Sequence, residues 1–115
     1  MSQKRDILFD ISISERKMIM TYQEKYESLM EKYIKKKKVT ISGLQKKEKV
    51  PYPLAEKLYI EWKNYHDELY WHNAVYEISF MEEPPTPARI MDMFNISYCF
   101  AKKLFDYYIE VSNEY

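Results

Sequence analysis

Few residues in this chain could perform acid–base, nucleophilic or metal chemistry, and they are scattered. His66 and His72 flank Asp67 and Glu68, a combination that raises the question of a metal site. Their six-residue spacing fits neither one face of a helix nor a usual ligand pair, and the chain has only one cysteine to add. We therefore expect two partly exposed histidines and no bound metal.

The single cysteine, Cys99, could act as a nucleophile beside a histidine. No pattern in the sequence supplies an oxyanion hole or a third, orienting group, so a buried or groove-facing thiol is the better interpretation. The only glycine, Gly43, excludes Gly-rich phosphate loops and dinucleotide fingerprints. We expect no enzymatic activity and no cofactor, and a lone cysteine argues against a secreted, disulfide-stapled fold.

Basic residues, mostly lysines, are concentrated in the first half of the sequence. Residues 1–50 carry 13 Lys and Arg against 7 Asp and Glu, whereas residues 51–115 carry 5 against 11, although the net charge is zero. Such an asymmetry favours polyanion binding by the basic half, or else a solvated helix surface with attraction between the halves. The run Lys35 to Lys38 has the same two interpretations.

The 115 residues suffice for one domain, or for two small units that share a core. Alternating apolar residues predict a short strand over 7–13. A long helix is expected from about Ser12 to Lys38, with a capping box from Ser12 to Glu15. No apolar run approaches the ~18 residues of a membrane span, and the N-terminus does not resemble a signal peptide, so we expect a cytoplasmic protein.

An internal repeat follows, with a shift of 46 positions between residues 40–62 and 86–108. In each copy a threonine, Thr40 or Thr86, caps a short helix. A turn with one buried aliphatic residue leads into a longer helix, in which Ala55 and Ala101 allow close packing. The identical or conservative pairs lie mostly at core positions: Leu44 and Ile90, Val50 and Ile96, Tyr52 and Tyr98, Leu58 and Leu104, Trp62 and Tyr108.

Between the two copies, Leu69 to Trp71 and Ala74 to Phe80 are rich in β-branched and aromatic residues. We expect an antiparallel hairpin there, with a turn at His72-Asn73, and a linker at residues 82–85. A helix through residues 63–80 is the competing prediction.

Together these patterns predict a mainly α fold with two helix-turn-helix-like units, a long N-terminal helix and one small β-hairpin wing. The expected organisation is an N-terminal strand and helix over residues 1–39, a first unit with the wing over 40–83, and a second unit over 84–115.

A short helix followed by aliphatic-x-Tyr-x-x-Ala-x-Lys-Leu resembles helix-turn-helix and winged-helix DNA-binding domains. The run Asn95 to Tyr98 is similar to the turn of lac-type repressors, and Val50-Pro51-Tyr52 with Ala55 is similar to the winged-helix tail of bacterial DNA translocases. The resemblance covers about 23 residues in each copy. The glycine usual in the turn is replaced by Lys49 and Asn95.

The resemblance implies that the second helix of a unit enters the major groove of double-stranded DNA and contacts base edges with its first residues. Lys46, Lys47 and Lys49 would then contact phosphates. The residues nominated at base edges are Tyr52, Pro53 and Lys57 in the first copy, and Ser97, Tyr98, Cys99 and Lys103 in the second.

The resulting hypothesis is a small, dimeric transcriptional regulator, and the Tyr-, Lys- and Ile-rich composition suggests a viral or plasmid origin. The basic first copy is the better candidate for DNA, because acidic residues flank the second. The alternative is a winged-helix-like protein-interaction module that does not bind DNA.

Overall fold

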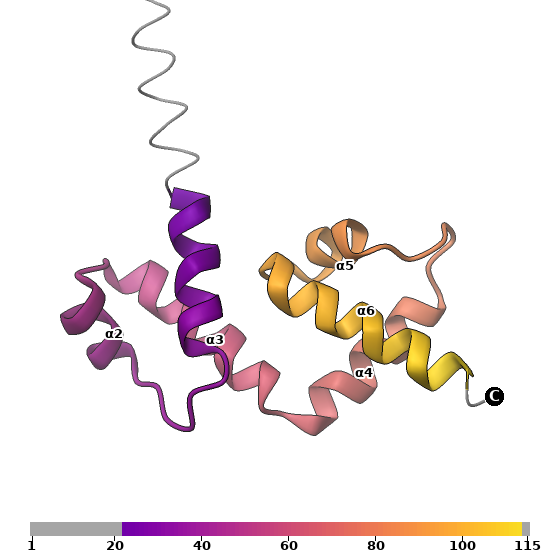
Figure 1. Ribbon diagram of the computed structural model, residues 1–115, viewed down its shortest axis with the longest axis horizontal. Coiled ribbons are helices and arrows are strands. Elements are labelled where there is room, and N and C mark those ends of the chain that lie inside the picture. The colour runs from indigo at the N-terminus through magenta and orange to yellow at the C-terminus, as the bar shows by residue number, and fades with distance from the viewer. Residues whose placement is uncertain (1–21, 114–115) are drawn as a thin grey trace, which may run out of the picture.

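The computed structural model describes residues 22–113, which form helices joined by turns, with no strand in that range. The first helix is described over residues 22–33 and precedes five more helices (Figure 1). These are α2 (Ile41–Glu48), α3 (Tyr52–Tyr65), α4 (Glu68–Ser79), α5 (Pro87–Phe94) and α6 (Tyr98–Asn113). The strand expected at 7–13 and the expected start of the first helix lie outside the described residues.

The first helix ends at residue 33 and not at Lys38 as expected. Four consecutive lysines repel one another, and Val39 must leave the helix to be buried in the core. Two backbone carbonyls just after the helix contact side chains of α3 and its C-cap. His66 Nε2 lies 2.7 Å from the oxygen of Ile34, and Trp62 donates to the oxygen of Lys36 at 2.8 Å. Lys35 to Lys38 therefore belong to an exposed connection rather than to a helix end.

The helix boundaries agree with the expected repeat. A shift of 46 residues carries both ends of α2 onto those of α5 and the first residue of α3 onto that of α6. Thr40 caps α2 through the amide of Gly43 at 3.0 Å, and Thr86 caps α5 through the amide of Arg89 at 3.2 Å. Both short helices end on a left-handed residue, Lys49 with φ 54° and Asn95 with φ 52°.

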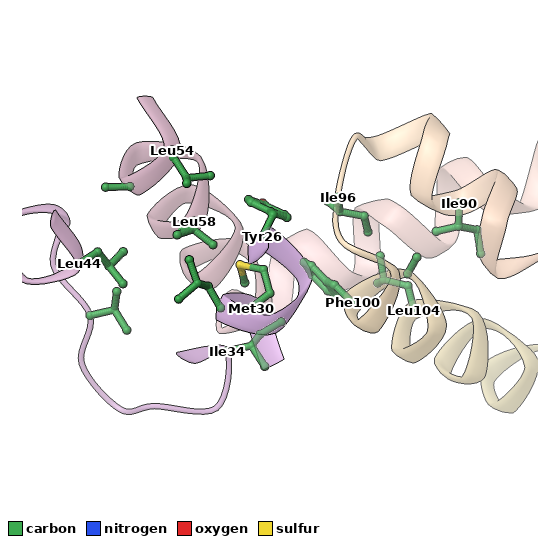
Figure 2. Close-up of a cluster of buried hydrophobic side chains, with 14 of the residues drawn as sticks. Tyr26, Met30, Ile34, Leu44, Leu54, Leu58, Ile90, Ile96, Phe100 and Leu104 are labelled. Atoms are coloured by element: carbon green, nitrogen blue, oxygen red, sulfur yellow. The ribbon is translucent and has the colours of Figure 1, made fainter. Parts of the chain in front are cut away.

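The same shift relates the buried side chains of the two copies (Figure 2). Ala55 and Ala101 are both fully buried, as expected of small residues where two helices pack closely. Tyr26 and Met30 of the first helix, and Ile34 directly after it, lie between the two groups of core residues. The core pairs of the copies are Leu44 and Ile90, Val50 and Ile96, Leu54 and Phe100, Leu58 and Leu104.

The predicted β-hairpin wing is wrong, because residues 68–79 form helix α4. Asp67 caps this helix through the amide of Leu69 at 3.1 Å. Ala74 and Ile78 are buried four residues apart, and the rings of Tyr70 and Trp71 pack against Phe100. Burial of this helical face outweighs the strand preference of the β-branched and aromatic residues. The winged-helix prediction is thereby reduced to a plain helical one.

The six helices form two units of three that lie side by side, within extents of 62 × 37 × 17 Å (Figure 1). The first helix packs with α2 and α3, and Tyr33 donates to Glu48 at 2.6 Å, near the end of α2. α4 contacts both α3 and α6, and α5 packs on α6. Each unit thus supplies one helix that supports a two-helix copy of the repeat.

The left-handed residue at the end of α2 generates a prediction. Lys49→Gly should raise the free energy of unfolding by about 1 kcal/mol, because a Cβ is disfavoured at positive φ. Asn95→Gly is the matched control at the equivalent turn and should change stability less, since asparagine tolerates this conformation. Urea unfolding of the three proteins measures both effects, and a loss of stability in Lys49→Gly would contradict the strain argument.

Candidate nucleic-acid interface

The end of α2 and the start of α3 form an exposed, basic corner of the first unit. Lys46 and Lys47 lie in the last turn of α2, Lys49 follows as its C-cap, and all three are exposed. Within residues 22–113 none of the three forms an ion pair. Pro51 and Pro53 flank Tyr52 at the start of α3, and all of these residues are exposed. This corner can therefore present three cations and the amino end of a helix to a polyanion.

Tyr52 and Lys57, both nominated to read bases, have different surroundings. Tyr52 is 52% exposed, and a hydrogen bond with Glu56, one turn further along α3, raises the pKa of the Tyr52 hydroxyl. Lys57 is half-buried, with its ammonium 4.5 Å from the centroid of the Tyr26 ring. This cation–π contact holds Lys57 toward the first helix, so Tyr52 is the freer of the two side chains.

The corresponding amino end of α6 is closed by other parts of the chain. Ser97 is only 1% exposed, so we remove it from the residues nominated to contact bases. Its Oγ accepts from the amide of Phe100 at 3.4 Å, as a helix cap does, and donates to the Glu61 carboxylate. Glu27 of the first helix accepts from the amide of Tyr98 at 2.6 Å. The carboxylates of Glu61 and Glu27 thus accept hydrogen bonds from the backbone amides of Ser97 and Tyr98, where α6 begins.

The remaining nominated residues of the second copy surround this closed end. Tyr98 is 47% exposed, Lys103 is half-buried, and Cys99 is half-buried. The Cys99 Sγ lies 3.2 Å from Ser97 Oγ, and burial raises the pKa of the thiol above its ordinary value. The equivalent tyrosines and lysines of the two copies are thus about equally exposed. The copies differ at the amino end of the longer helix, which is exposed at α3 and is covered by Glu27 and Glu61 at α6.

Glu61 is the residue that joins the two units. Its carboxyl is 2% exposed and accepts from the Tyr26 hydroxyl at 2.7 Å, from the Ser97 amide at 2.9 Å and from the Ser97 hydroxyl. Burial raises the pKa of Glu61, while the hydrogen bonds from Ser97 and Tyr26 act in the opposite direction. Burial and the neighbouring Glu61 also raise the pKa of Tyr26.

Sequence reasoning missed both Glu61 and Glu27. A signal for Glu61 was present, because it lies seven residues after Leu54 and three after Leu58 on the buried face of α3. A carboxylate on such a face must find hydrogen-bond donors. Glu27 carries no comparable signal, since its role depends on how the first helix packs against α6.

Each of the two histidines lies beside another group of the chain. His66 contacts the Ile34 carbonyl, and His72 lies 3.9 Å from Glu68 on α4. Residues 22–113 contain no cluster of three or more potential metal ligands. Within the same residues, no helix has the length and apolar character needed to cross a membrane.

A groove of about 350 Å³ separates the two units beside Glu61. It runs between α3 and the turn after α5, and both polar and apolar residues line it. Its lining from α3 includes Pro53, Lys57, Ile60 and Asn64, and its lining from the second unit includes Phe94, Asn95 and Ile96.

The buried carboxyl generates a stability prediction. Glu61→Ala should lower the free energy of unfolding by about 2–4 kcal/mol, because the Tyr26 hydroxyl and the Ser97 amide would be left buried without an acceptor. Glu61→Gln retains an acceptor oxygen and should cost clearly less. Urea unfolding compares the two variants with the wild type, and equal costs would show that the hydrogen bonds to Glu61 are unimportant.

The raised pKa of Glu61 predicts the direction of a pH effect. The folded chain holds this proton more tightly than the unfolded chain, so the contribution of Glu61 is fully present below the unfolded pKa, about 4.3, and is lost as the pH rises through the folded pKa. The stability of the wild type relative to Glu61→Gln should therefore fall as the pH rises above about 4.3. Urea unfolding of both proteins over a pH series measures this difference. A difference that grows with pH would mean that the fold prefers the ionised carboxylate.

No protein-family model, curated protein or solved structure matches the chain.

Proposed function

We propose that the protein binds double-stranded DNA through the first unit, with α3 as its recognition helix, and acts as a small transcriptional regulator. The observation that carries this proposal is the open, basic corner formed by Lys46, Lys47, Lys49 and the exposed start of α3. Lysines at this corner favour phosphate contacts, which supply most of the affinity of DNA-binding proteins.

The geometry around the turn supports a helix-turn-helix. Three residues, Lys49 to Pro51, join an eight-residue helix to a fourteen-residue helix, and the turn begins with a left-handed residue. A recognition helix meets base edges with its amino-terminal residues, and Tyr52 stands there with half of its surface exposed. The Tyr52 hydroxyl and ring are therefore the groups we assign to base contacts.

Charge favours the first unit over the second. Residues 22–66 carry 11 Lys and Arg against 6 Asp and Glu, whereas residues 67–113 carry 3 against 8. The second unit would therefore repel phosphate, and the carboxylates of Glu27 and Glu61 already occupy the start of α6. We assign a structural role to the second unit, so that each chain has one recognition helix, α3.

The proposal predicts a salt-dependent loss in a charge variant. Combining Lys46→Ala, Lys47→Ala and Lys49→Asn should weaken binding to duplexes of any sequence and reduce the slope of log K against log salt by about 1 for each lysine. Asparagine at position 49 avoids added strain, because Asn95 occupies the equivalent turn. Fluorescence anisotropy at two or more salt concentrations measures both quantities.

The matched control is Lys102→Ala with Lys103→Ala, a pair of adjacent lysines on α6. It should leave affinity and salt slope nearly unchanged, and Tyr52→Ala should reduce discrimination between sequences by roughly 1–3 kcal/mol. Equal losses from both lysine sets would show that the second unit also binds DNA. A folded wild type that binds no duplex at low salt would refute the proposal.

A protein-interaction module without DNA binding is the second candidate. The zero net charge favours it, as do the exposed aromatic residues Tyr76 and Phe80 on α4. With α4 in place of the wing, this alternative is a purely helical module over residues 22–113. The absence of DNA binding at low salt would separate it from the regulator.

A further inference from the structure

The outer face of α4 carries the most exposed large apolar side chains of residues 22–113. Leu69 is 65% exposed, Tyr76 is 66% exposed and Phe80, which follows the helix as its C-cap, is 68% exposed. Together with the exposed Asn73 they are spaced four, three and four residues apart, the spacing of a helix–helix seam. We call these four residues the α4 stripe. The Tyr76 and Phe80 rings touch each other, with centroids 4.8 Å apart.

The first helix shows that a three-helix unit of this protein does not need an apolar outer face. Tyr26 and Met30 of the first helix, and Ile34 directly after its end, are buried at intervals of four. Tyr70, Ala74 and Ile78 on α4 have the same spacing, with Tyr70 partly buried and the other two buried. When the segments are aligned on these residues, Leu69 and Tyr76 correspond to Lys25 and Lys32 of the first helix, and Phe80 corresponds to Lys36 in the connection after it, and all three lysines are exposed. The second unit therefore has an apolar surface where the first has a charged one.

We propose that the α4 stripe is the interface for a second copy of this chain, related by a two-fold axis that passes beside Asn73. An amide side chain both donates and accepts hydrogen bonds, so two copies of Asn73 satisfy each other across such an axis. Against a wholly apolar partner the same amide would be buried without a partner, at a cost in free energy. A polar residue at one position of an apolar seam also fixes register and oligomeric state.

The size and charge of the surface determine how this dimer behaves. The exposed parts of the three apolar side chains amount to roughly 400 Å² for each copy, about half of what one partner of a standard interface contributes. The second units are both acidic, with 8 Asp and Glu against 3 Lys and Arg in residues 67–113, so they repel one another. Salt screens this repulsion, and the dimer should therefore tighten as salt is added.

This arrangement does not depend on DNA binding. It leaves the basic corner of each first unit outside the dimer contact, so the two activities can be tested separately.

The experiment is sedimentation equilibrium of the full chain without DNA, over a range of protein and salt concentrations. We expect a reversible monomer–dimer equilibrium that tightens with salt and stops at the dimer. Combining Tyr76→Lys with Phe80→Lys copies the lysines at the aligned positions 32 and 36 and should weaken dimerisation by roughly 100-fold or more. Asn73→Asp, which is nearly isosteric, should also dissociate the dimer because two carboxylates would meet at the axis.

The matched control is Met93→Lys, which adds a charge at an exposed apolar residue of α5, 44% exposed and away from the α4 stripe. It should leave the dimer intact, and circular dichroism checks that each variant keeps its helices. A wild type that is monomeric at every concentration overturns the proposal. So does association that weakens with salt and continues beyond dimers, since that behaviour indicates contact between the acidic unit of one copy and the basic unit of another.

Discussion

The buried carboxyl of Glu61 is the constraint on which the arrangement of the two units depends. A carboxyl removed from water needs hydrogen-bond donors, and here they come from the first helix through Tyr26 and from the start of α6 through Ser97. Three segments far apart in the sequence must therefore meet at one point. Apolar packing alone tolerates several arrangements, whereas donors and acceptors at 2.7 and 2.9 Å tolerate few.

This constraint makes the two copies of the repeat unequal. In the second copy Ser97 caps α6 and binds Glu61, whereas the equivalent residue of the first copy is Pro51, which has no amide proton to donate. In place of Glu61 the second copy has Tyr107, which packs its ring against Trp71. The start of α6 is consequently held inside the molecule, and the start of α3 is left exposed. One backbone pattern thus supports two different surfaces.

Much of the fold could be predicted from the sequence, because helix caps and core spacing are local signals. Thr40 and Thr86 cap the short helices as predicted, and the pairs of predicted core residues are buried. The wing failed because β-branched and aromatic residues around Ala74 resemble a strand when their tertiary contacts are unknown, and packing on Phe100 decides in favour of a helix. The closed end of α6 could not be predicted, since Glu27 and Tyr98 are 71 residues apart and nothing local relates them.

The two units also differ in their surface charge and in their exposed apolar residues. Two similar helix pairs in one chain can carry different surfaces, because each requires mainly its core residues and caps to fold. The first unit keeps lysines on its outer helix and beside the start of α3, a surface that favours a polyanion and keeps copies of this unit apart. The second unit lacks that positive charge and exposes aromatic rings on α4. An apolar contact between acidic units would leave the basic units directed toward other partners.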